Sequence, residues 1–95
     1  MAFVYILECS DGSFYTGWTA DLERRLATHD SGRGARYTRG RRPVRLVHWE
    51  GQPDRSSAQR REAELRRLSR PLKLRLIADH LQGLAPGSSQ GGAVL

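Results

Sequence analysis

Four side chains in the first third of the chain have the types expected of a site that handles phosphate. They are Tyr5, Tyr15, Arg25 and His29, of which the last two are one helical turn apart. A tyrosine hydroxyl can donate or accept a proton, an arginine can clamp a phosphate, and a histidine can move a proton at neutral pH. Together these residues indicate a site for phosphodiester chemistry.

Both tyrosines fall on a predicted β-hairpin that turns at Ser10-Asp11-Gly12. A two-residue turn would put them on opposite faces, because side chains alternate along a strand. A three-residue turn with a left-handed glycine would instead place Tyr5 opposite Gly17 and Tyr15 opposite Leu7. The sequence permits both turns. We predict the three-residue turn because only this turn brings the two tyrosines to one face.

Arg25 and His29 belong to a helix predicted over residues 20–30, with Thr19 as its N-cap. Both side chains should lie beside the apolar seam of this helix rather than point away from the protein. An arginine beside such a seam needs an anionic partner, because unpaired burial of charge is costly. A bound phosphate is one candidate partner, and Asp21, one turn earlier, is the other.

A basic stretch, here called the arginine segment (residues 33–42), follows this helix. Its candidate nucleic-acid-binding residues are Arg33, Arg36, Tyr37, Arg39, Arg41 and Arg42. A flexible basic loop that contains an aromatic ring can follow a phosphate backbone and stack on a base. The alternative interpretation is an ordinary solvated surface loop.

The composition supports a polyanionic partner. Sixteen Lys and Arg residues against ten Asp and Glu give a formal charge of +6, which favours nucleic acid through counterion release. Cys9 is the single cysteine and excludes an internal disulfide. No run approaches the ~20 apolar residues of a membrane span or the charged-then-apolar pattern of a secretion signal, so we expect neither. We therefore expect a cytoplasmic protein with no membrane partner. The sequence does not specify a protein partner.

The 95 residues suit one domain with one modest core. The predicted order is ββαβαα, with strands at 3–9, 13–18 and 43–50. The first helix is predicted at 20–30, the second runs from a capping box at 56–59 to about 68, and the last ends at about 81. This order indicates an α+β fold, a three-stranded antiparallel sheet flanked by helices. The domain should cover residues 1–82, and residues 83–95 have the composition of a flexible tail.

Over residues 2–80 the chain resembles the GIY-YIG nuclease superfamily, in particular its small stand-alone bacterial members. Val4-Tyr5-Ile6 corresponds to the first motif and Tyr15-Thr16-Gly17 to the second. The helix with Arg25 and His29 follows at the family's spacing, and residues 35–43 also resemble the stand-alone group. The chain departs from the pattern at Val4, Thr16 and Trp18, where the family usually has glycine and isoleucine and some repair nucleases have lysine.

The resemblance implies a hydrolase, a divalent-metal-dependent endonuclease that cuts nucleic acid, DNA rather than RNA, in repair or processing. It further implies one Mg²⁺ or Mn²⁺ ion held by a glutamate. Helix geometry does not decide between Glu62 and Glu64, but the family's glutamate stands three residues before an aliphatic residue, which favours Glu62. The implied catalytic residues are Tyr5, Tyr15, Arg25, His29 and Glu62, with Glu62 as the metal ligand.

These roles set a chemical condition on Tyr5. To activate or orient the attacking water, it needs a pKa well below ~10 or a proton relay through a neighbour. Arg25 would hold a phosphate oxygen, and Tyr15 and His29 would position the phosphate and exchange protons. Glu64 would be a solvated partner of Arg60 or Arg67. The alternative reading is a nucleic-acid-binding module with the same fold and little or no catalysis.

Overall fold

Three antiparallel strands in the order β2-β1-β3 form the centre of the computed structural model, which describes residues 1–84. The elements along the chain are β1 (Ala2–Glu8), β2 (Phe14–Thr19), α1 (Leu22–Asp30), α2 (Arg36–Arg39), β3 (Arg45–Gln52), α3 (Arg55–Arg66) and α4 (Arg70–Leu84). The predicted α+β class and the three-stranded antiparallel sheet are confirmed. None of the helices in residues 1–84 is long and apolar enough to span a membrane.

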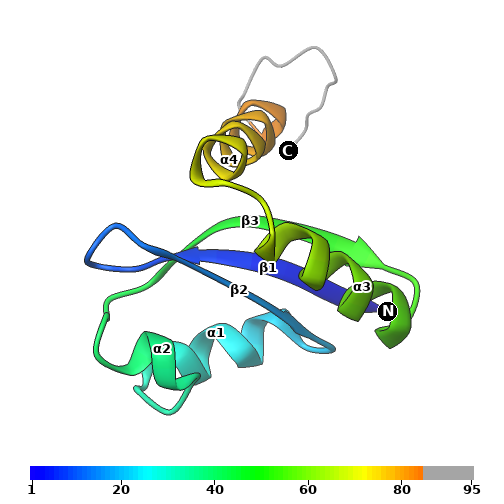
Figure 1. The fold of residues 1–95 in the computed structure, drawn as a ribbon. Helices are drawn as coiled ribbons and strands as arrows, with labels where there is room; N and C mark the ends of the chain where they lie inside the picture. The colour runs from blue at the N-terminus through cyan, green and yellow to red at the C-terminus, as the bar shows by residue number, and fades with distance from the viewer. Residues whose placement is uncertain (85–95) are drawn as a thin grey trace.

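The helices lie on both faces of the sheet, so the molecule has three layers. Figure 1 shows α1 and α2 below the sheet and α3 and α4 above it. The main apolar core lies between the sheet and the upper helices and consists of Ala2, Val4, Ile6, Val47, Ala58, Leu65 and Ile77. Because strand side chains alternate, β1 points Val4 and Ile6 into this core and Tyr5 to the opposite face. The tyrosine therefore faces α1.

The hairpin turns through three residues, as predicted. Gly12 has a φ of +84°, the left-handed conformation that glycine adopts without steric cost. Its N–H donates to the Cys9 carbonyl over 2.9 Å, and the Cys9 N–H donates to the Ser13 carbonyl over 2.9 Å. The bonds close a turn of three residues between Cys9 and Ser13, so the alternative two-residue turn is excluded.

The register that follows from this turn brings the two tyrosine motifs together. Tyr5 lies opposite Gly17, and Tyr15 lies opposite Leu7. Residues at alternate positions of paired strands share a face, so both phenol rings project toward α1. Their ring centroids are 6.4 Å apart. The three-residue turn therefore brings Tyr5 and Tyr15 to one face of the sheet, as predicted.

Aspartates rather than hydroxyl residues begin two of the helices. Asp21 is the N-cap of α1, where its carboxylate accepts the Arg24 N–H over 3.1 Å, so the prediction of Thr19 as the cap was wrong. Thr19 instead accepts the Asp21 N–H over 3.1 Å. Asp54 begins α3 and accepts the Ser57 N–H over 2.8 Å, ahead of the predicted serine cap. An ionised carboxylate also interacts favourably with the positive end of the helix dipole.

The loops differ from the prediction at three places. The arginine segment is not a loop throughout, because it contains the short helix α2. The third strand begins at Arg45, two residues later than expected, and runs to Gln52. The last helix extends to Leu84, so the first two positions of the predicted tail belong to α4. The remainder of that predicted tail, residues 85–95, lies outside the described residues.

An ion pair fixes α3 against the sheet. The Arg61 guanidinium on α3 donates to both carboxylate oxygens of Glu50 on β3, over 2.7 and 3.1 Å. His48, also on β3, contacts the same carboxylate through Nε2 at 2.8 Å. Two parallel bonds from one guanidinium define an orientation as well as a distance. The position of the neighbouring Glu62 is set by this contact together with the buried seam of α3.

Candidate active site

Tyr5 lies at the centre of a buried chain of hydrogen bonds. Its hydroxyl oxygen is 3.0 Å from His29 Nε2, and Arg25 Nε donates to the same oxygen over 3.4 Å. Tyr5 is 1% exposed and His29 is fully buried. The Arg25 side chain thus reaches Tyr5 rather than Asp21, and within residues 1–84 it forms no ion pair. The sequence alternative of an Arg25–Asp21 ion pair is not realised.

Thr38 on α2 extends this series of hydrogen bonds and determines which group donates in each of them. The Thr38 hydroxyl donates to the Ala35 carbonyl over 3.0 Å and lies 2.8 Å from His29 Nδ1. Because the hydroxyl hydrogen is used on Ala35, Thr38 accepts from His29 Nδ1–H. A neutral imidazole protonated at Nδ1 is an acceptor at Nε2. The Tyr5 hydroxyl therefore donates to His29.

The local electrostatics favour this protonation state. Burial, followed by the nearby positive charge of Arg25, lowers the pKa of His29, so the ring is neutral at pH 7. Burial raises the pKa of Tyr5, and the hydrogen bond from Arg25 offsets only part of this effect. Tyr5 is thus a protonated phenol. Tyr5 therefore lacks the lowered pKa that would let it activate water directly. Its hydrogen bond to His29 instead provides a path along which it can pass on a proton.

Gly17 leaves the room that the two tyrosine rings need. A Cβ at this position would stand 2.6 Å from the Tyr5 hydroxyl oxygen and 3.1 Å from the Tyr15 ring. Neither ring can move away easily, because Tyr5 is hydrogen-bonded to His29 and Tyr15 packs against the His29 ring with centroids 5.4 Å apart. Glycine at this strand position therefore leaves the space that the Tyr5 hydroxyl and the Tyr15 ring occupy.

Glu62 approaches this centre from the other side of β2. Its α3 neighbours Ala58 and Leu65 are fully buried, and its own side chain is 18% exposed. The carboxylate pairs with Arg66, which also donates to the Thr16 carbonyl on β2 over 3.4 Å. Glu62 is close enough for its charge to contribute to the raised pKa of Tyr5.

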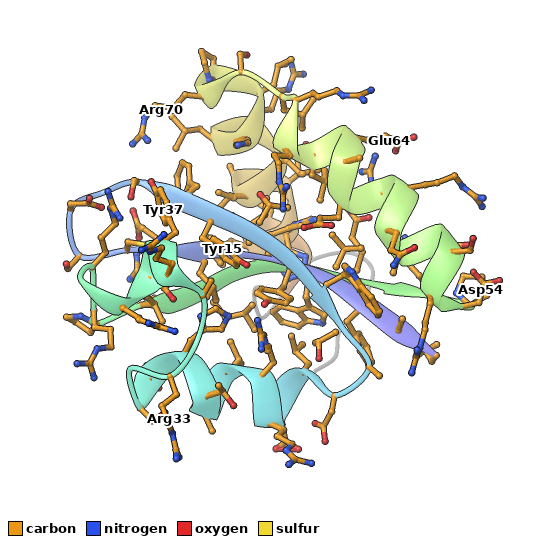
Figure 2. The ribbon with its side chains drawn as sticks, turned by 60° about the horizontal axis from the view of Figure 1, so that its bottom comes forward. Tyr15, Arg33, Tyr37, Asp54, Glu64 and Arg70 are labelled. Atoms are coloured by element: carbon orange, nitrogen blue, oxygen red, sulfur yellow. The ribbon has the colours of Figure 1, made fainter. Side chains whose placement is uncertain are left out.

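Glu64, the competing candidate, points elsewhere. Its side chain is 63% exposed and pairs with Arg61 at 3.2 Å, rather than with Arg60 or Arg67. Figure 2 shows it on the outer side of α3, away from the labelled Tyr15. The structure therefore brings Glu62, and not Glu64, toward the tyrosines.

A divalent ion at this place would have few protein ligands. Within residues 1–84 no group of three or more His, Cys, Asp or Glu side chains could hold a metal ion. Mg²⁺, however, often binds through one or two carboxylates together with substrate phosphate and several waters. The single carboxylate of Glu62 fits an ion of that kind once a phosphate is present. Arg66 would have to release the carboxylate for such binding.

The arginine segment is held in place by its own side chains. Arg41, half-buried, pairs with Asp11 at 3.0 Å and lies 4.0 Å from the centroid of the Tyr37 ring. Arg42 and Arg39 donate to the carbonyls of Asp30 and Gly34. These contacts anchor α2 to the hairpin and to the end of α1. The segment is therefore a short helix held by side-chain contacts rather than the loop that the sequence predicted.

Four arginines of this segment remain exposed, namely Arg33, Arg36, Arg39 and Arg42, and Tyr37 is 37% exposed. Figure 2 shows Arg33 beyond the end of α1, pointing outward and away from Tyr15. Tyr37 instead lies near Tyr15, with ring centroids 6.0 Å apart. The four exposed arginines thus form a basic edge on the outside of the molecule. Tyr37 instead contacts an aromatic ring of the candidate site.

Two residues of the site did not emerge from the sequence. Thr38 lies in a polar, basic segment where nothing signals that one hydroxyl is fully buried. Arg66 stands four residues after Glu62, a spacing that places two helical side chains together. That spacing was the available signal for the ion pair, whereas the contact of Thr38 with His29 depends on how α2 folds back over α1.

Comparison with known families assigns this small α+β domain to a class of nuclease domains. Residues 1–76 match the family model described as the GIY-YIG catalytic domain. The chain belongs to this family, as its motifs suggested. The family match indicates nuclease activity and a nucleic-acid substrate.

Relatives of similar length support the assignment. The chain is 54% identical over 77 residues to a UPF0213 protein of Natronomonas pharaonis. The aligned residues cover 81% of this chain and 91% of that protein. The solution structure of a UPF0213 protein from Bacillus halodurans is 52% identical, with a TM-score of 0.53 over 82% of this chain and 84% of that one. The solution structure of a protein from E. faecalis is 43% identical in sequence, with a TM-score of 0.54 over 83% of this chain and 85% of that one.

Proposed function

We propose that the protein is a divalent-metal-dependent endonuclease that hydrolyses phosphodiester bonds in DNA, in repair or processing. The observation that carries this proposal is the convergence of two different chemical groups at β2. A buried Tyr5–His29–Thr38 relay approaches from the α1 side, and a half-buried carboxylate, Glu62, approaches from α3. The first can move a proton and the second can hold a cation.

In the proposed reaction, Tyr5 accepts a proton from the attacking water and passes its own proton to His29 Nε2. The water oxygen bonds to phosphorus while the bond to the 3′ oxygen breaks, and the leaving oxygen takes a proton from solvent. Arg25, whose guanidinium lies at the Tyr5 hydroxyl, stabilises the charge that builds on a phosphate oxygen. An Mg²⁺ or Mn²⁺ ion on Glu62 would neutralise charge on the phosphate and the leaving oxygen.

Binding would use the exposed basic edge of the arginine segment. Arg33, Arg36, Arg39 and Arg42 are exposed, and the net charge of the chain is +6. Contacts of this kind are made to the phosphate backbone and position the nucleic acid without reading its sequence. Affinity should therefore fall steeply as salt concentration rises.

The test compares Glu62→Ala with Glu64→Ala, a matched loss of a carboxylate two residues away on the same helix. Labelled branched, single-stranded and duplex DNA, and RNA of the same sequence, are incubated with Mg²⁺, with Mn²⁺ or with chelator. Wild type and Glu64→Ala should cut DNA only when metal is present. Glu62→Ala should lose cleavage by on the order of 10²-fold or more, because stabilisation of charge at the phosphate is lost.

The alternative function gives a different result in the same experiment. If wild type binds these nucleic acids in a salt-dependent way but leaves all of them intact with either metal, the chain is a binding module and the nuclease proposal is wrong. Circular dichroism of both variants excludes a loss of fold as the cause of inactivity.

A further inference from the structure

A cleft of about 320 Å³ lies along the open edge of the sheet. Its lining consists of Phe14, Tyr15, Thr16, Tyr37, Arg66 and Lys73. The outer strand β2 forms its floor, and α2, α3 and α4 each contribute one side chain to its walls. We call it the β2 cleft.

The β2 cleft adjoins the candidate active site through two shared residues. Tyr15 lines the cleft and also packs against the rings of His29 and Tyr5. Arg66 lines the cleft and binds the Glu62 carboxylate. The β2 cleft therefore opens beside the candidate active site.

One part of the cleft is aromatic. The rings of Tyr15 and Tyr37 are inclined by only 29°, and Figure 2 shows the two residues close together on one side of the molecule. Phe14 adds a third ring from the opposite face of β2, and the Arg70 guanidinium lies over it with its carbon 4.8 Å from the ring centroid. Aromatic faces of this kind are the surfaces on which unpaired bases stack.

The rest of the cleft carries positive charge. Arg66 and Lys73 supply cationic groups, and no acidic side chain lines the cleft within the described residues. Glu62 neutralises part of the charge of Arg66 and is itself the proposed metal ligand, so the arginine becomes available when metal binds. Rings and cations in one cleft complement a base together with its phosphate.

We propose that the β2 cleft binds an unpaired nucleotide next to the bond that is cut, with its base on the aromatic rings and its phosphate at Lys73 and Arg66. This inference rests on the proposed function and narrows its substrate class. A base within a duplex must leave its stack and its partner before it can enter such a pocket, whereas a single-stranded base need not. The substrate is therefore nucleic acid with a single-stranded or bulged nucleotide at the cleavage position.

The test measures binding in chelator, so it does not depend on cleavage; Glu62 still holds Arg66 there, and Lys73 supplies the phosphate contact. Fluorescence anisotropy gives the Kd of a short single strand and of a hairpin duplex of the same sequence at the same salt concentration. Phe14→Leu should weaken single-strand binding by about tenfold, as loss of one stacking ring does. Lys73→Ala should weaken it several-fold, and both variants should change duplex binding by less than about twofold.

Arg75→Ala is the matched control, because this exposed cation lies on the same helix as Lys73 but does not line the cleft. It should leave the preference for the single strand unchanged. Phe14 packs against the apolar core, so thermal melting of Phe14→Leu is measured beside binding. Lys73→Ala removes no core contact and tests the proposal even if the first variant unfolds.

Photo-crosslinking identifies the occupant directly. A single strand that carries 5-iodouracil should crosslink to Phe14, Tyr15 or Tyr37. Crosslinks confined to other residues of the arginine segment, or equal wild-type affinity for the single strand and the duplex, would overturn the inference. A protein that cuts duplex DNA without a single-strand preference contradicts the β2 cleft alone. A protein that keeps the preference but never cuts contradicts the nuclease proposal alone.

Discussion

The α1 side and the α3 side of the site are built in opposite ways. On the α1 side Tyr5, His29 and Thr38 are at most 1% exposed and joined by hydrogen bonds of 2.8–3.0 Å. On the α3 side Glu62 and Arg66 form an ion pair whose side chains are 18% and 63% exposed. The groups that move protons are therefore fixed before substrate arrives, whereas the groups that handle charge can exchange partners.

This difference determines what a substitution does on each side. A buried polar group left without its partner costs about 1–3 kcal/mol, whereas an exposed ion pair contributes about 0–1 kcal/mol. Changes on the α1 side should therefore lower stability and activity together. Changes at Glu62 should remove activity and leave the fold nearly as stable.

The largest expected effect comes from breaking the relay at its centre. Tyr5→Phe removes the hydroxyl that bonds His29 and keeps the ring, so cleavage should fall by roughly 10²–10⁴-fold while DNA affinity changes little. Single-turnover cleavage rates and anisotropy measure the two quantities separately. Tyr37→Phe is the control, because its ring lies beside the site but its hydroxyl is outside the relay. A Tyr5→Phe rate within about threefold of wild type would contradict the relay.

A smaller effect is expected one bond further along the relay. Thr38→Val keeps the shape of the side chain but removes the acceptor of His29 Nδ1–H, so the imidazole tautomer is no longer fixed. Cleavage should fall by about tenfold, and the free energy of unfolding should fall by about 1–3 kcal/mol.

Thr38→Ser separates positioning from packing, because it restores the hydroxyl without the methyl group. It should recover most of the cleavage rate. Nitrogen NMR of His29 should report a proton on Nδ1 in wild type and in Thr38→Ser, and a mixture of tautomers in Thr38→Val. Equal tautomer populations in all three proteins would show that Thr38 does not direct the proton.

Local rules predicted the parts of the site that depend on near neighbours in sequence. The sequence Ser10-Asp11-Gly12 limits the hairpin to two turn types, and the requirement that Tyr5 and Tyr15 share a face selects the three-residue turn that fixes their register. The apolar seam of α1 places Arg25 and His29 on one side of the helix. Local rules chose the wrong cap between Thr19 and Asp21, because both residues can bond to the backbone at this place.

The other parts depend on packing between distant segments. Glu62 and Glu64 are nearly equivalent in the helical pattern, and they differ only because Arg61 and the buried Leu65 orient α3 on the sheet. Thr38 meets His29 because α2 folds back over α1, a contact between two segments that no periodicity relates. Near neighbours in sequence therefore determine the faces on which the candidate residues lie, and tertiary packing determines which side chains each of them contacts.

The smallest expected effect is a pH dependence that belongs to the α1 side. Burial and Arg25 lower the pKa of His29 in the folded protein, whereas an unfolded histidine has a pKa of ~6.5. As pH falls below about 6.5, the unfolded state therefore binds more protons than the folded state, and the free energy of unfolding decreases. His80, whose pKa burial also lowers, acts with the same sign.

Urea denaturation between about pH 7.5 and pH 5.5 measures this dependence. His29→Gln and His80→Gln each remove one titrating ring, so each should lose part of the wild-type slope of unfolding free energy against pH. Because His29 is fully buried and His80 is not, the larger loss should come from His29→Gln, whatever that variant costs in stability at pH 7.5. If the slope of unfolding free energy against pH for His29→Gln instead equals that of wild type, the folded protein protonates His29 as readily as the unfolded chain does. In that case burial on the α1 side does not disfavour a charged side chain, and the contrast with the α3 side is wrong.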